Sequence, residues 1–112
     1  MRNLSMLVLV FASIAAPLAM AAGSNIDIIF PVDGAKLDAM EQNKLDYSIT
    51  LDGAGDHAHV YVDGKETALL RVMNGSHTLE SLTPGKHEIC IKVVNKNHTP
   101  IGVDRCIKVT VE

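Results

Sequence analysis

Hydrophobic and polar residues alternate along most of the chain after residue 25, which is the pattern of strands that bury one face. In residues 45–51, four apolar side chains share one face and Asp46, Ser48 and Thr50 occupy the other, as in a half-buried strand. The remaining runs that are typical of strands are 26–30, 57–62, 66–72, 76–82, 86–94 and 102–111. Residues 36–43 lack this alternation and are expected to be irregular, or at most a short helical turn.

Turn residues separate these runs at the short intervals that are typical of a β-sandwich. Asp63-Gly64 lies between two runs and suits a two-residue type I′ hairpin turn, which requires a positive φ at both positions. Asn74-Gly75 and Pro84-Gly85 mark further turns. We therefore expect one all-β domain, an antiparallel β-sandwich of about seven strands.

The first 21 residues have the composition of a secretory signal peptide. The positive charge of Arg2 precedes an apolar stretch, and Ala19-Met20-Ala21 fits the small-x-small cleavage motif. The uninterrupted apolar run is shorter than the ~20 residues of a membrane span, and no Lys or Arg flanks its end. We therefore expect a signal peptide in residues 1–21, a sandwich domain in residues 22–112, and a periplasmic or secreted protein without a membrane span after cleavage.

The domain that remains after cleavage is acidic and poor in aromatic residues. Loss of Arg2 leaves 9 basic against 13 acidic residues, which is a net charge of −4. This charge disfavours nucleic acids and anionic lipids as partners. The chain contains no Gly-x-Ser-x-Gly motif and no other recognisable catalytic arrangement, so we expect a protein that is not an enzyme.

The last two runs form a hairpin whose register follows from the positions of charges and cysteines. If Cys90 faces Cys106, the neighbouring pairs on the same face join opposite charges. The register then gives the pairs Glu88–Lys108, Ile89–Ile107, Ile91–Arg105, Lys92–Asp104 and Val94–Gly102, with a loop over residues 95–101. Two cysteines in an exported domain favour a disulfide between Cys90 and Cys106, and the alternative is a redox-active or metal-binding thiol pair.

The Leu-x-Pro-Gly turn that opens residues 82–93 resembles the entry to the next-to-last strand of bacterial Ig-like domains. Residues 30–35 and the loop 95–102 are similar to the same family, so the resemblance covers nearly all of residues 25–112. It implies an Ig-like sandwich and leaves the function open, because this fold hosts many functions. Where many such domains have a Tyr after the Pro-Gly turn, this chain has His87, which is expected to make a structural hydrogen bond in its place.

The main candidate for chemistry is the pair His57-x-His59, because alternate residues of a strand project to the same side. Two imidazoles on one face suit a copper(II) or zinc(II) ion, and His98 on the last loop is a candidate helper. Further candidate helpers are Met73, Cys90 and Cys106. The alternatives are two solvated histidines beside a turn, or a polar surface that binds a protein.

Two functions therefore remain open for the domain. The first is an exported, non-enzymatic binding or accessory module that contacts another periplasmic or cell-surface protein. Its expected binding surface consists of His57, His59, Tyr61 and His98. The second is a periplasmic metal-binding protein, for copper before zinc, with His57 and His59 as ligands. His77 and His87 fall on inward faces and are expected to be hydrogen-bonded residues at the edge of the core.

Overall fold

The computed structural model describes residues 23–112, so the predicted signal peptide of residues 1–21 lies outside the described part of the chain. Residues 23–112 form eight strands, one more than the sequence suggests. They are β1 (Asn25–Phe30), β2 (Lys36–Leu37), β3 (Lys44–Thr50), β4 (His57–Val62), β5 (Lys65–Leu70), β6 (Asn74–Thr78), β7 (Gly85–Val94) and β8 (Pro100–Val111). Residues 23–112 contain no helix that is long and apolar enough to cross a membrane.

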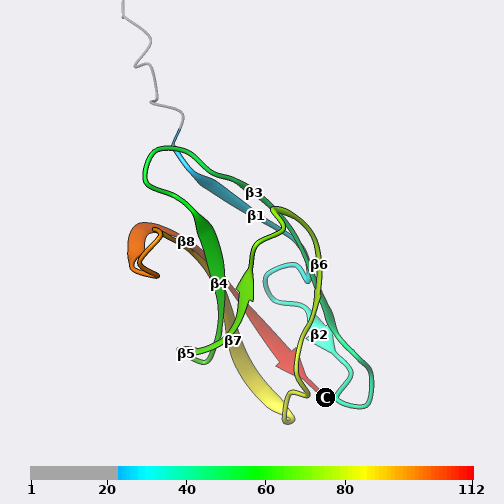
Figure 1. Ribbon diagram of the computed structural model, residues 1–112. Coiled ribbons are helices and arrows are strands. Elements are labelled where there is room, and N and C mark those ends of the chain that lie inside the picture. The colour runs from blue at the N-terminus through cyan, green and yellow to red at the C-terminus, as the bar shows by residue number, and fades with distance from the viewer. Residues whose placement is uncertain (1–22) are drawn as a thin grey trace, which may run out of the picture.

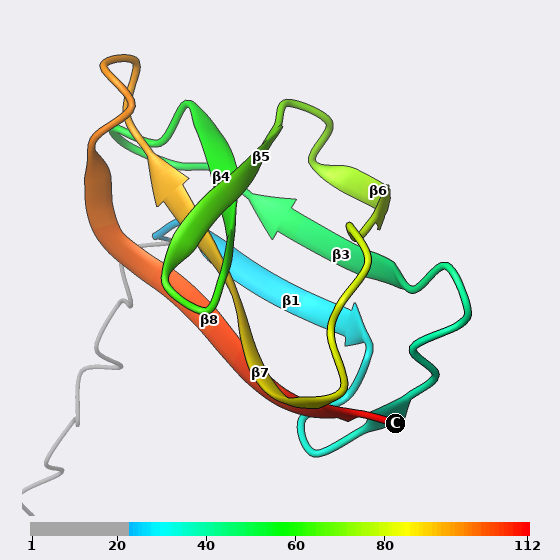
Figure 2. The ribbon, with the colours of Figure 1, turned by 90° about the horizontal axis from the view of Figure 1, so that it is seen from below.

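The strands form two sheets that pack face to face, which confirms the predicted all-β sandwich (Figure 1). One sheet has three strands in the order β1-β3-β6, and the other has five in the order β2-β8-β7-β4-β5. Figure 2 shows the hairpin of β4 and β5 and the hairpin of β7 and β8 in the same layer. The turn between β4 and β5 has a positive φ at both Asp63 and Gly64, as the predicted type I′ turn requires.

The core lies between the sheets and contains the inward side chains of the alternating runs. Leu45, Tyr47 and Ile49 of β3 are buried, and so are Ala58 and Val60 of β4. The burial of aliphatic side chains on facing sheets is the main source of stability in a sandwich. The core therefore confirms the predicted alternation in β3 and the inward positions of Ala58 and Val60, whereas the positions between and before them in β4, His57 and His59, are buried as well.

Three local predictions outside the last hairpin are wrong. Asn74-Gly75 was expected to be a turn, but both residues belong to β6, which pairs with β3. The alternation of residues 26–30 puts Phe30 on the same face as Ile26 and Ile28, but Phe30 is 46% exposed because the pairing of β1 with β3 shifts between Ile28 and Phe30. Residues 36–43 were expected to be irregular, which holds for residues 38–43 but not for Lys36 and Leu37, because these two residues form β2 and pair in parallel with the end of β8. Two residues are too few to show an alternation, so the sequence carries no signal for β2.

The hairpin of β7 and β8 has the predicted register at its centre. Cys90 pairs with Cys106, and the pairs on either side follow as expected from Glu88–Lys108 to Lys92–Asp104. The end of the hairpin differs, because Val94 pairs with Pro100 rather than with Gly102. The partners of Lys92 and Val94 in β8 are separated by three residues, whereas Lys92 and Val94 themselves are separated by one. Because β8 already begins at Pro100, the loop covers residues 95–99 instead of the predicted 95–101.

The two cysteines form the disulfide Cys90–Cys106, and the structure contains no free cysteine. Disulfides form and persist in oxidising compartments, so this bond agrees with export. The bond is part of the antiparallel pairing of β7 and β8, and it leaves no thiolate at this position.

His87 joins three segments of the chain at the edge of the core. Its Nδ1–H donates to Oδ2 of Asp63 at 2.6 Å, and its Nε2–H donates to the carbonyl of Thr83 at 2.6 Å. Since both ring nitrogens face acceptors, the arrangement favours the protonated imidazolium. The bond to Asp63 is the main cause that raises the pKa of His87, and the backbone N–H of Glu88 is the main cause that lowers the pKa of Asp63. The expected structural hydrogen bond of His87 is confirmed.

We predict that His87→Gln lowers the free energy of unfolding by about 1 kcal/mol at pH 5.5 and by less at pH 9. A group whose pKa is raised in the folded state stabilises fully below its unfolded pKa, and this contribution is lost as the pH rises through the folded pKa. Urea unfolding of both proteins at the two pH values measures the difference. An equal loss of stability at pH 5.5 and pH 9 would contradict the charged interaction.

Candidate metal centre

The candidate site is built on the outward face of β4. Ala58 and Val60 point into the core and are fully buried, so the alternation places His57 and His59 together on the opposite face. β4 lies between β5 and β7, so both histidines project from the interior of the five-stranded sheet and not from an edge. The backbone of a strand that is paired on both sides is firmly held, so two imidazoles have a fixed spacing.

Both histidines are buried although they lie on the outer face of the sheet. Their exposed fractions are 1% for His57 and 2% for His59. The loop of residues 95–99 brings His98 onto this face, with ring centroids 4.7 Å from His57 and 5.3 Å from His59. His57 and His59 are therefore not solvated, and that interpretation is wrong. Of the three histidines, only His98 is exposed.

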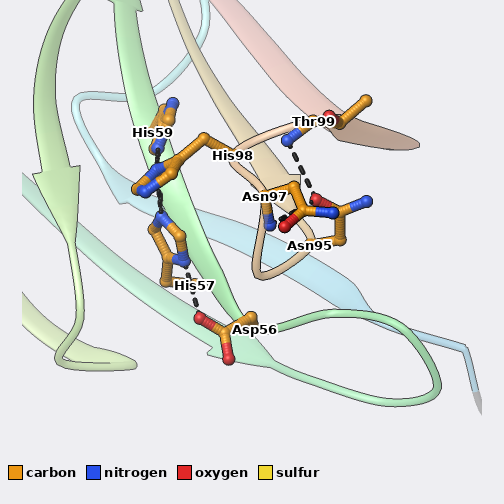
Figure 3. Close-up of polar contacts among 7 residues, drawn as sticks. All are labelled: Asp56, His57, His59, Asn95, Asn97, His98 and Thr99. Atoms are coloured by element: carbon orange, nitrogen blue, oxygen red, sulfur yellow. Dashed lines mark hydrogen bonds and ion pairs between the residues drawn. The ribbon is translucent and has the colours of Figure 1, made fainter.

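The three imidazoles direct one nitrogen each at a common point (Figure 3). Nε2 of His57 lies 3.1 Å from Nε2 of His59 and 3.0 Å from Nδ1 of His98, and the third separation is 3.2 Å. Nitrogens bound at about 2.0–2.1 Å to one ion stand roughly 2.8–3.4 Å apart, depending on whether the angle at the ion is square or tetrahedral. The observed triangle fits that range on all three sides.

A carboxylate approaches the far side of each ring on β4. Nδ1–H of His57 donates to Oδ2 of Asp56 at 2.8 Å, so the lone pair of this ring lies on Nε2, which faces the other two rings. Oε1 of Glu66 lies 3.2 Å from Nδ1 of His59, although the contact is not aligned as a hydrogen bond. A carboxylate on the second nitrogen orients a metal-binding histidine and increases its basicity as a ligand.

The environment of His59 favours the neutral ring, which is the form that binds metals. Burial is the main cause that lowers its pKa, and the positive forms of His57 and His98 act in the same direction. The charge of Glu66 opposes this shift and is the smaller effect. A lone pair is therefore available on His59 at neutral pH.

The other predicted site residues lie in different surroundings. Tyr61 is adjacent to the cluster, with its ring 6.4 Å from that of His59 and the Nζ of Lys92 4.7 Å above it. Met73 packs against the core beside β3, where its carbonyl accepts a hydrogen bond from Ile49. The sulfur atoms of Cys90 and Cys106 lie near a carboxylate of Glu88, but the disulfide removes both thiolates as ligands.

Sequence reasoning did not place the two carboxylates that lie against the histidines of β4, those of Asp56 and Glu66. Asp56 directly precedes His57, so a carboxylate next to a His-x-His pair is the signal that sequence offers. Glu66 reaches His59 through the pairing of β5 with β4, which shifts register between Val60 and Tyr61. That irregularity is not encoded in the alternation of residues, so the position of Glu66 needs the structure.

No family model and no curated protein matches the chain. Among solved structures, a fibronectin(III)-like module of CbhA from Clostridium thermocellum matches with a TM-score of 0.63 and 15% identity, over 78% of this chain and 95% of that one. The fold is that of a bacterial Ig-like β-sandwich domain. The comparison confirms the predicted fold class and, at this identity, extends to the fold alone.

Two further structures share the Ig-like fold over part of their length. A lytic polysaccharide monooxygenase from Jonesia denitrificans matches with a TM-score of 0.52 and 19% identity, over 73% of this chain and 60% of that one. The extracellular domain of a putative one component system, BT4673 from B. thetaiotaomicron, matches with a TM-score of 0.51 and 11% identity, over 80% of this chain and 15% of that one. The chain thus spans less than two thirds of either protein, and neither likeness carries an activity to it.

We predict that Nδ1, and not Nε2, is the protonated nitrogen in the neutral ring of His57 in the metal-free protein. The reason is the hydrogen bond to Asp56, which needs a donor on that nitrogen. Long-range ¹H–¹⁵N spectra of the imidazole rings distinguish the two tautomers. A proton on Nε2 of His57 would mean that this nitrogen does not offer a lone pair to the cluster.

Proposed function

We propose that this domain is an exported, non-enzymatic binding module whose ligand is a divalent transition-metal ion. The ligands are Nε2 of His57, Nε2 of His59 and Nδ1 of His98. The observation that carries the proposal is the triangle of these nitrogens, with sides of 3.0–3.2 Å, on a face where two of the rings are almost completely buried.

A cation explains why three rings converge in this way. The proton of His57 is held on the far side of its ring by Asp56, so its lone pair faces the other two nitrogens. Lone pairs that face one another repel unless a proton or a metal ion lies between them, and burial strengthens this repulsion. A metal ion satisfies all three nitrogens at once, whereas one proton is shared between only two of them.

The donor atoms favour copper(II), and zinc(II) after it. Imidazole suits both ions, and the general order of affinities places copper(II) above zinc(II) for the same site. Copper(I) prefers soft sulfur ligands, but the cysteines are joined in a disulfide and Met73 packs against the core. An all-nitrogen site in an oxidising compartment therefore fits the divalent ion.

The position of the site favours exchange with another protein. His98 is exposed on the loop between β7 and β8, so the third ligand lies at the surface while the first two are covered. We expect the ion to be received from, or passed to, another periplasmic or cell-surface protein. The accessory function and the metal-binding function, which the sequence leaves as alternatives, are then two aspects of one surface.

We predict that the cleaved protein binds one equivalent of copper(II), and that His57→Ala, His59→Ala and His98→Ala each weaken binding by at least about 10-fold. Loss of a ligand is expected to cost no less than loss of a residue that only orients one, which is typically 10–100-fold. Competition titration against a chelator of known affinity measures each constant. His77→Ala is the matched control, because His77 lies on β6 in the other sheet. If the double variant of His57 and His59 binds as tightly as the unaltered protein, the site is wrong.

We further predict that the double variant Cys90→Ala/Cys106→Ala keeps its affinity for copper(II) but is less stable. The chain-entropy model gives a loss of about 3 kcal/mol in the free energy of unfolding for a loop of this length. The cross-link limits the unfolded chain but supplies no ligand. Urea unfolding and the same titration give the two values. A loss of affinity in the folded double variant would show that the sulfur atoms belong to the site.

A further inference from the structure

The three ligands differ in how the fold holds them. His57 and His59 are part of a strand that is paired on both sides, whereas His98 belongs to the short loop of residues 95–99. His98 also has a φ of 61°, which lies in the left-handed region that residues other than glycine rarely adopt. Such a conformation persists only where the surroundings hold it, so some other group in the loop must hold His98 in place.

Asn95 makes the hydrogen bonds that close this loop. Its Oδ1 accepts from the backbone N–H of Asn97 at 2.9 Å and from that of Thr99 at 3.0 Å (Figure 3). Its backbone N–H donates to the carbonyl of Thr99 at 2.9 Å, and its carbonyl accepts from the N–H of His98 at 3.0 Å. The bonds span both sides of His98, so they fix the direction in which its side chain leaves the loop.

We propose that Asn95 is a positioning residue of the metal site, which acts by holding His98 over His57 and His59. This proposal rests on the proposed function. Asn95 itself does not contact the ion. The tight spacing of the nitrogens makes the claim specific, because Nδ1 of His98 must stay about 3 Å from both Nε2 atoms to complete the set of ligands. A displaced His98 leaves an ion with two protein ligands instead of three.

Three variants of the loop distinguish the positioning of His98 by Asn95 from a general effect on the structure of the loop. Asn95→Ala removes the side-chain acceptor, whereas Asn95→Asp keeps an oxygen in the same place for both N–H groups. Asn97→Ala is a matched control in the same loop, because Asn97 takes part through its backbone N–H, which alanine retains. Circular dichroism and urea unfolding confirm that each variant is folded.

The experiment is a copper(II) titration of these variants, with and without His98→Ala, together with electron paramagnetic resonance of the loaded proteins. We expect Asn95→Ala to weaken copper(II) binding about 10–100-fold and to change the spectrum toward that of His98→Ala. Asn95→Asp and Asn97→Ala should bind and give spectra like the unaltered protein. In the presence of His98→Ala, the change Asn95→Ala should have no further effect.

Three results would overturn the proposal for Asn95: unchanged binding by Asn95→Ala, an equal additional loss in the His98→Ala background, or failure of Asn95→Asp to retain binding. A separate result would overturn the metal site itself, namely copper(II) binding that does not depend on His57 and His59. The two failures are distinguishable because the second is measured in proteins with an intact Asn95.

Discussion

The antiparallel pairing of β7 and β8 is the constraint on which the rest of the structure depends. It joins two long strands in the middle of the larger sheet, carries the disulfide, and gives β4 a partner on one side. Its irregular end determines how long the connecting loop is and where it emerges. Because His57 pairs with Val94, the last residue of β7, that loop begins directly beside the two histidines of β4.

The site follows from this pairing together with ordinary strand geometry. Alternation on β4 puts two imidazoles on one face, and the loop that follows β7 adds a third from 39 and 41 residues away. Asp56 and Glu66 then act on the far sides of the β4 rings. A polar cluster of this kind is costly to bury without a partner that satisfies it, and the proposed cation would contact all three nitrogens.

The sequence predicts those features that depend on local pattern. Alternation indicates the strands, and opposite charges beside the cysteines indicate the register of the last hairpin. The exposure of Phe30 and the pairing of Val94 with Pro100 could not be predicted, because irregularities in pairing interrupt the alternation. The same holds for the site: the His-x-His pair is visible in the sequence, whereas its burial and the contribution of Asn95 depend on where a distant loop lies.

The central claim is that one divalent ion is held by three imidazoles on the outer face of the larger sheet. A crystal structure of the cleaved protein loaded with one equivalent of copper(II) tests it most directly. The account predicts one ion with Nε2 of His57, Nε2 of His59 and Nδ1 of His98 each at about 2.0–2.2 Å. An ion bound elsewhere, or three rings that remain as close together with no ion among them, would contradict it.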